Sequence, residues 1–190
     1  MLFSSLEIRK DSPEILKNAD SISLNKSFVF VDGDKRKLLT EKIGLITKDK
    51  SVFFKTDGAW SMIDLVGHTL EQSGPAEIHF ATWSIGPEAI RNFIHWQEIG
   101  TITSIYGVID EGFRNRKPDL FHQAKAAFAS LKFYKSHAKL VIIKSESHQV
   151  TIMGSANLTR NPRTETGIII CDQALADANI KWIMEGSGYE

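Results

Sequence analysis

From Trp60 onward, short segments rich in β-branched and aromatic residues alternate with longer segments whose apolar residues recur at helical spacing. The first pattern is typical of strands and the second of helices that pack by one face. The sequence predicts helices from near Trp60 to near Gly74 and at 87–98, 118–130 and 173–184. It predicts strands at 27–31, 51–56, 76–82, 101–109, 137–143, 149–153 and 166–171. This alternation favours an α/β fold, with helices packed on the faces of a sheet.

The length and composition fit a folded chain of ordinary globular type. The chain has 190 residues, of which 42% are hydrophobic and 24% charged, a balance that argues against disorder. That length is enough for one compact domain with a small appendage. We expect an N-terminal extension or small subdomain over residues 1–58 and the main α/β domain over residues 59–190.

Charge and cysteine content narrow the classes of function. Lysine and arginine number 23, as do aspartate and glutamate, so the formal net charge is zero and nucleic-acid binding would need a local basic patch. The lone Cys171 excludes a disulfide framework, fits a reducing compartment and is expected as a buried apolar residue. No stretch approaches the roughly 20 apolar residues of a membrane span, and no signal-peptide pattern is seen. We therefore expect a cytoplasmic protein without a membrane span.

An ionisable pair lies at the start of a predicted internal strand. Residues two apart in a strand share a face, so the strand expected at 137–143 places His137 and Lys139 on the same side. The residues that follow are apolar on both faces, which is typical of an internal strand. An ionisable pair in this position costs stability unless it is satisfied or used. The pair is therefore the first candidate for chemistry.

Small and polar residues follow the next predicted strand. Gly154 lets the backbone approach a ligand closely, and Ser155 and Asn157 supply neutral donors. A neutral imidazole such as that of His137 is a competent nucleophile toward phosphorus, and a carboxylate such as Glu165 can fix its tautomer and orientation. A lysine with two neutral donors can hold phosphoryl oxygens as negative charge redistributes. These residue types are the parts needed for phosphoryl transfer.

The order His137-x-Lys139, then Gly154-Ser155-x-Asn157, then Glu165 resembles the signature of the phospholipase D superfamily. It is most similar to the small bacterial nucleases that carry one such HKD motif per chain. The resemblance implies a mixed sheet flanked by helices on both faces, with residues 59–190 as the catalytic domain. At the position five residues after Lys139, where the family has Asp, this chain has Lys144.

The resemblance also implies a mechanism and a stoichiometry. In the family, two motifs meet in one site: one His forms a phosphohistidine and the other protonates the leaving group, with no metal or other cofactor. The chain has six His, and only His137 has a Lys two residues later, so it holds half of such a site. We expect a homodimer whose two-fold axis passes through the active site. His137, Lys139, Ser155, Asn157 and Glu165 are the expected catalytic residues.

Basic side chains near the motif suggest the substrate. Arg160 and Arg163 lie within the motif loop, and Arg114, Arg116 and Lys117 follow a predicted strand end, where ligands of open α/β sheets bind. We expect these five to contact a nucleic-acid backbone, with DNA favoured over RNA. A phospholipid phosphodiesterase or phosphatidyl transferase is the alternative enzyme. A phospholipase D-like module that binds nucleic acid or a partner without turnover is the alternative outside enzymes. Trp83 is expected in the core or near the dimer axis.

Overall fold

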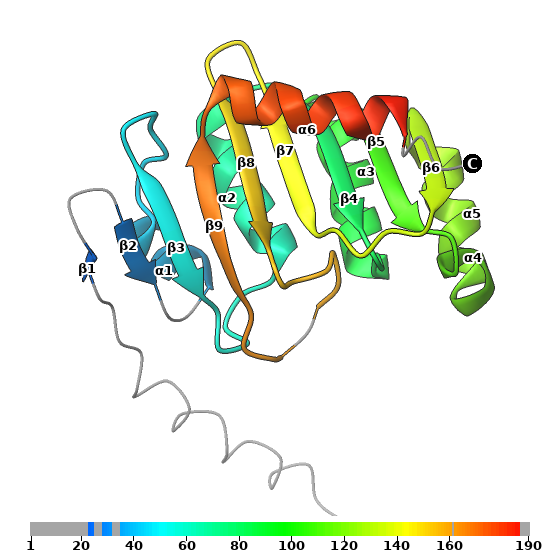
Figure 1. Ribbon diagram of the computed structural model, residues 1–190, viewed down its shortest axis with the longest axis horizontal. Coiled ribbons are helices and arrows are strands. Elements are labelled where there is room, and N and C mark those ends of the chain that lie inside the picture. Colours follow the sequence, from blue (N-terminus) through cyan, green and yellow to red (C-terminus); the bar gives the residue numbers. More distant parts are fainter. Residues whose placement is uncertain (1–22, 25–27, 32–34, 161, 187–190) are drawn as a thin grey trace, which may run out of the picture.

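The structure, a computed structural model, describes residues 23–24, 28–31, 35–160 and 162–186. Within these ranges the strands form one mixed sheet in the order β1-β2-β3-β9-β8-β7-β4-β5-β6 (Figure 1). The strands are β1 (Ser23–Leu24), β2 (Phe28–Val31), β3 (Ser51–Lys55), β4 (Ala76–Thr82), β5 (Ile102–Asp110), β6 (Ser130–Tyr134), β7 (Leu140–Lys144), β8 (Gln149–Gly154) and β9 (Thr166–Cys171). The helices are α1 (Lys35–Lys42), α2 (Met62–Ser73), α3 (Pro87–Glu98), α4 (Phe113–Arg116), α5 (Pro118–Ala127) and α6 (Gln173–Glu185).

Helices cover both faces of the sheet. In Figure 1, α6 crosses the near face, and α2, α3 and α5 lie behind the sheet. The helices behind the sheet bury the larger core, whereas α6 buries a smaller cluster that includes Ile142 and Ile183. Central strands such as β7 are apolar on both faces because both faces are covered. The predicted class, an α/β sheet flanked by helices on both faces, is confirmed. No helix in the described ranges is long and apolar enough to cross a membrane.

The strand directions bring many loops to one edge of the sheet. β4 runs parallel to β5 and antiparallel to β7, and β8 runs antiparallel to both β7 and β9. The carboxyl ends of β3, β4, β5, β6 and β8 therefore meet the amino ends of β7 and β9 at the edge drawn lowest in Figure 1. We call this the lower edge. It carries the segments that immediately follow Lys55, Thr82, Asp110, Tyr134 and Gly154.

Two predicted elements differ from those observed. The strand expected at 137–143 begins only at Leu140, where the pairing with β4 begins, so His137 and Lys139 precede the strand. The helix expected at 118–130 ends at Ala127, because Phe128 adopts an extended backbone. The sequence then forms β6, a strand that was not predicted and that pairs in parallel with β5.

The sheet runs without a break across residue 58, where the sequence analysis divided the chain. β3 precedes that position and pairs with β9 along its whole length. Its inward side chains, Val52 and Phe54, belong to the main core. The division into 1–58 and 59–190 stays a prediction, and residues 1–22 lie outside the described residues.

Cys171 and Trp83 were both considered for buried positions, but they differ in their exposure. Cys171, at the end of β9, is buried, as predicted. Trp83 is 37% exposed, so the first of its two expected places, the core, is wrong, and a position near the dimer axis stays a prediction. The physical reason is its position: it follows the last residue of β4 and so lies beyond the sheet, at the lower edge.

Candidate active site

The predicted nucleophile and its lysine lie together at the lower edge. His137 is exposed in the segment between β6 and β7, and Lys139 is partly buried just before β7. The Lys139 Nζ atom lies 3.1 Å from His137 Nδ1 and donates to the His137 carbonyl oxygen at 2.9 Å. The pair is thus adjacent although the two residues do not share a strand, since the lysine side chain folds back over the histidine.

The charge of Lys139 depends on two opposing influences. Burial lowers the pKa of its amine, because a charged group is less favourable away from water. The nearby carboxylate of Glu165 acts in the opposite direction and raises that pKa. The predicted Lys139 and Glu165, which come from opposite ends of the motif, are therefore electrostatically coupled in the folded chain.

Ser155 and Glu165 are joined directly where β8 ends and β9 begins. The Ser155 hydroxyl donates to the Glu165 carboxylate. The backbone of Ser155 is fixed by its N–H bond to the Thr166 carbonyl at 2.9 Å. The Glu165 backbone is held by Thr56 through bonds of 2.8 and 3.0 Å. Glu165 thus contacts the motif serine, and its expected role in orienting His137 stays a prediction.

Asn157 is held against the end of β4. Its Oδ1 atom accepts a hydrogen bond from Thr82 Oγ1 at 3.2 Å. The same loop forms a bridge between Leu158 and Ile85, and Gly86 donates to the Leu158 carbonyl at 2.8 Å. These contacts anchor the loop after β8 to the segment after β4. With its oxygen directed at Thr82, the amide nitrogen of Asn157 is the group that can donate to a ligand.

Gly154 is explained by strand packing. A Cβ at this position would lie 2.2 Å from the Thr166 carbonyl oxygen and 2.8 Å from the Cα of Gly167. Any side chain here would collide with backbone atoms of β9, which cannot move as a flexible side chain can. The expected close approach is therefore to the neighbouring strand, and it fixes the position from which Ser155 projects.

A tryptophan outside the predicted set lies beside His137. The Trp83 ring is centred 6.2 Å from the His137 ring, with the two planes inclined by 58°. The guanidinium of Arg116 covers the Trp83 ring at 4.2 Å from its centre. Arg116 is itself held by Asp110 Oδ1 at 2.9 Å and by the Trp83 carbonyl oxygen at 3.1 Å. No local pattern indicates this cluster, because its members come from three segments that lie far apart in the sequence.

The five predicted substrate-binding residues all lie at the lower edge and are exposed, but they differ in what engages them. Arg116 is occupied by Asp110 and Trp83, as described above. Arg114 lies over the Phe121 ring at 5.6 Å, and Arg160 lies 4.0 Å from the Glu88 carboxylate. The side chains of Lys117 and Arg163 extend into solvent, as their exposure indicates. Contact of any of these with a substrate stays a prediction.

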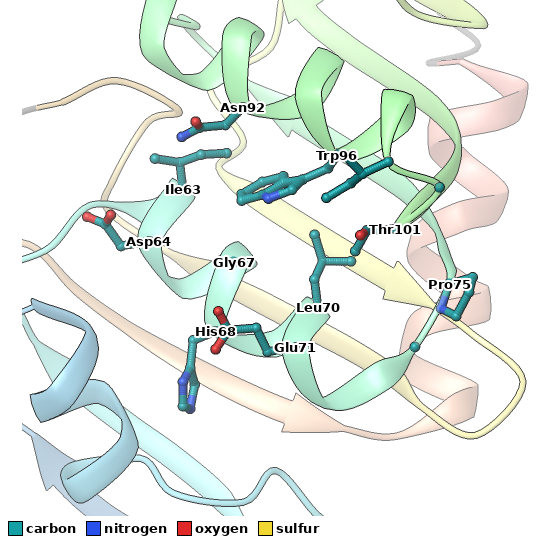
Figure 2. A pocket seen from close by; sticks show the side chains of 13 residues that line it. Ile63, Asp64, Gly67, His68, Leu70, Glu71, Pro75, Asn92, Trp96 and Thr101 are labelled. Carbon is teal, nitrogen blue, oxygen red and sulfur yellow. The ribbon is translucent and has the colours of Figure 1, made fainter.

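A separate groove lies between α2 and α3, away from these residues. It has a volume of about 670 Å³ and is lined by residues that include Gly67 and Trp96. Figure 2 shows the Trp96 ring lying between the two helices, over Gly67. None of the predicted site residues lines this groove. Within the described ranges, no three His, Cys, Asp or Glu side chains come together as a metal-binding group.

Comparisons with known proteins show a structural likeness but no sequence match. No protein-family model matches the sequence, and no curated protein matches it. Among solved structures, the chain is similar to TrmBL2, described as an archaeal chromatin protein that shows a novel mode of DNA binding. The identity is 16% and the TM-score 0.44, and the match covers 64% of this chain. It covers 46% of the other chain, so this protein spans less than half of that relative.

Proposed function

We propose that the protein is a metal-independent phosphodiesterase of the phospholipase D type that cleaves nucleic acid. The observation that carries the proposal is the gathering of the motif at the lower edge, where Lys139 lies 3.1 Å from His137 and the Ser155 hydroxyl donates to Glu165. These groups come from separate loops, and a purely structural histidine needs no such set around it. Exposure of His137 leaves its ring accessible to a phosphate.

The chemistry uses two steps. A ring nitrogen of His137 attacks phosphorus, and the bond from phosphorus to the leaving oxygen breaks as that oxygen takes a proton. Water then attacks the phosphohistidine, the phosphorus–nitrogen bond breaks, and the imidazole is restored. Lys139 and the Asn157 amide hold the non-bridging oxygens, whose negative charge redistributes in both transition states. Glu165 accepts the Ser155 hydroxyl and raises the pKa of Lys139, which favours the charged form of the lysine.

A second copy of the chain supplies the proton donor for the leaving group. The other histidines of this chain do not carry the motif, so the acid is the His137 of a second subunit. An isologous dimer places the same residue of both subunits on either side of one phosphate. The exposed position of His137 at the lower edge leaves it accessible to a second subunit.

Nucleic acid, with DNA ahead of RNA, is the substrate that the surroundings favour. Arg114, Lys117, Arg160 and Arg163 line the lower edge as exposed cations, and the formal net charge of the chain is zero. A local basic rim can contact successive phosphates, so binding weakens steeply with salt. No described observation favours a lipid surface, and phospholipid cleavage is an alternative outcome of the experiment.

The test is cleavage of labelled single- and double-stranded DNA and RNA in EDTA. Wild-type protein should cleave, and His137→Ala should lose at least about 1,000-fold in rate because the nucleophile is gone. His148→Ala is the matched control, since His148 lies in the β7–β8 turn at the opposite edge of the sheet. It should keep wild-type activity.

The alternatives predict different results in the same assay. Loss of cleavage in EDTA would contradict the mechanism. Equal binding of nucleic acid by wild type and His137→Ala, with no cleavage by either, would indicate a binding module. Cleavage of phospholipid vesicles in place of oligonucleotides would indicate the lipid phosphodiesterase.

A further inference from the structure

An exposed aromatic ring beside a proposed nucleophile needs a physical reason. Trp83 is 37% exposed, although burying an indole ring is strongly favourable. Its ring lies 6.2 Å from that of His137, inclined by 58°, so the two rings form a wedge and are not stacked on each other. A partly exposed indole therefore lies beside the ring that would attack a bound phosphate.

The Trp83 ring is held in position by Arg116. The Arg116 guanidinium lies 4.2 Å from the ring centre, fixed by Asp110 and by the Trp83 carbonyl oxygen. Asp110 Oδ1 also accepts the Gly112 N–H at 3.2 Å. A Cβ at Gly112 would lie 2.4 Å from the Arg116 guanidinium, so the tight turn after β5 leaves room for the arginine.

The backbone that carries Trp83 is equally constrained. Thr82 donates to the Ser84 carbonyl at 2.8 Å and contacts Asn157. Two residues after Trp83, Ile85 forms a bridge with Leu158 in the motif loop. The tryptophan is thus presented on a short turn anchored at both ends to the loop of the active site. An exposed ring that is fixed in this way loses little conformational entropy when a flat ligand stacks on it.

We propose that Trp83 is a stacking platform for the nucleobase next to the scissile phosphate, and that Arg116 acts as its positioning residue. The inference rests on the proposed function, and it names single-stranded nucleic acid as the substrate class. Aromatic side chains stack on unpaired bases of any sequence, because every base has a π face. A base inside a duplex is already stacked and paired, so it must leave the helix before it can reach the indole. The enzyme should therefore prefer single strands and show little sequence specificity.

The experiment removes the Trp83 ring and the neighbouring base, first separately and then together, as in a double-mutant cycle. Wild type and Trp83→Leu are compared on a single-stranded oligonucleotide and on the same strand with one abasic site beside the cleavage point, placed on either side in turn. For wild type, loss of the stacked base should lower kcat/KM about 10-fold or more. For Trp83→Leu, the intact strand should already be about 10-fold poorer, and the abasic site should cost less than about 2-fold further. Trp83→Phe keeps a smaller ring and should fall between the two.

Equal losses from the abasic site in wild type and Trp83→Leu would overturn the inference. A second contrary result is that Trp83→Leu loses as much kcat/KM on an entirely abasic strand as on the intact strand. That result would also overturn the inference, because the ring would then act on His137 and not on a base. A monomeric mass of Trp83→Leu in gel filtration, with a dimeric wild type, would also overturn it and identify an interface residue. No cleavage by wild type of any strand would instead contradict the proposed function.

Tryptophan fluorescence tests stacking without turnover. In a His137→Asn background, added single strands should quench part of the emission, and Trp83→Phe should abolish that quenching. Trp96→Phe is the matched control, because Trp96 lies in the α2–α3 groove (Figure 2), away from the site. It should leave the quenching in place. Quenching that survives in Trp83→Phe would overturn the stacking platform, whether or not the protein cleaves nucleic acid.

Discussion

At the scale of single residues, Glu165 acts on two partners. It accepts the Ser155 hydroxyl and raises the pKa of Lys139 against the lowering effect of burial. Replacement of Glu165 by Gln keeps an oxygen that can accept from Ser155 but removes the negative charge. The pKa of Lys139 should then fall further below its ordinary value, because burial acts without opposition. If cleavage needs the charged lysine, the loss of activity in alkaline solution should therefore begin at a lower pH than in the wild type.

The measurement is the alkaline limb of kcat/KM against pH for wild type and Glu165→Gln. The limb should move to lower pH in the variant, with the rate near neutral pH less affected than the rate in alkali. Glu111→Gln is the control, since Glu111 is an exposed acid after β5 at the same edge of the sheet. Its limb should coincide with that of wild type. A Glu165→Gln limb at the wild-type position would show that Glu165 does not tune the lysine.

Among elements, the β8–β9 pair sets the position of the motif loop. Gly154 and Gly167 face each other across these strands, and a Cβ at Gly154 would lie 2.2 Å from the Thr166 carbonyl oxygen. Gly154→Ala should therefore lower the free energy of unfolding by about 1–3 kcal/mol, since backbone atoms must move to admit the methyl group. Urea denaturation measures the change.

Gly86→Ala is the matched control for that prediction. A Cβ there would lie 3.5 Å from the nearest atom, the Cα of Thr159, and the φ of Gly86 is −99°. Its loss should be about 1 kcal/mol or less, the cost of alanine at a helix N-cap. Similar losses of unfolding free energy in the two variants would mean that the backbone of β9 moves at little cost and that packing does not require a glycine at position 154.

The elements that the sequence predicted correctly are those whose pattern is local. The β4 strand and the α3 helix match their predictions because alternation and helical spacing are properties of neighbouring residues. β6 was missed because the apolar spacing of α5 continues through Phe128, and only pairing with β5 makes residues 130–134 a strand. The same limit applies to the site. The motif places His137 near Lys139, whereas the contact of Trp83 with Arg116 depends on two distant segments of the chain meeting in space.

For the whole molecule, the lower edge combines features from the entire sheet. The strands β3, β4, β5, β6 and β8 all end there, so segments far apart in sequence lie along the same edge as His137. One chain nevertheless supplies one copy of the motif. A proton donor for the leaving group must face the nucleophile from the other side of the phosphate. The proposed chemistry is therefore a property of two chains, and the activity of mixed dimers reports on it directly.

Mixing wild type with His137→Asn tests this requirement quantitatively. If each active site needs His137 from both subunits, only dimers of two wild-type chains are active. After subunit exchange at equal concentrations, about one quarter of the dimers are of that kind, so activity should fall to about one quarter of an all-wild-type sample. Independent sites would give about one half. The variant keeps a planar polar side chain, so mixed dimers should form normally, and gel filtration of differently tagged chains verifies the exchange. An activity that tracks the wild-type fraction linearly would contradict the shared site and require the acid to come from within one chain.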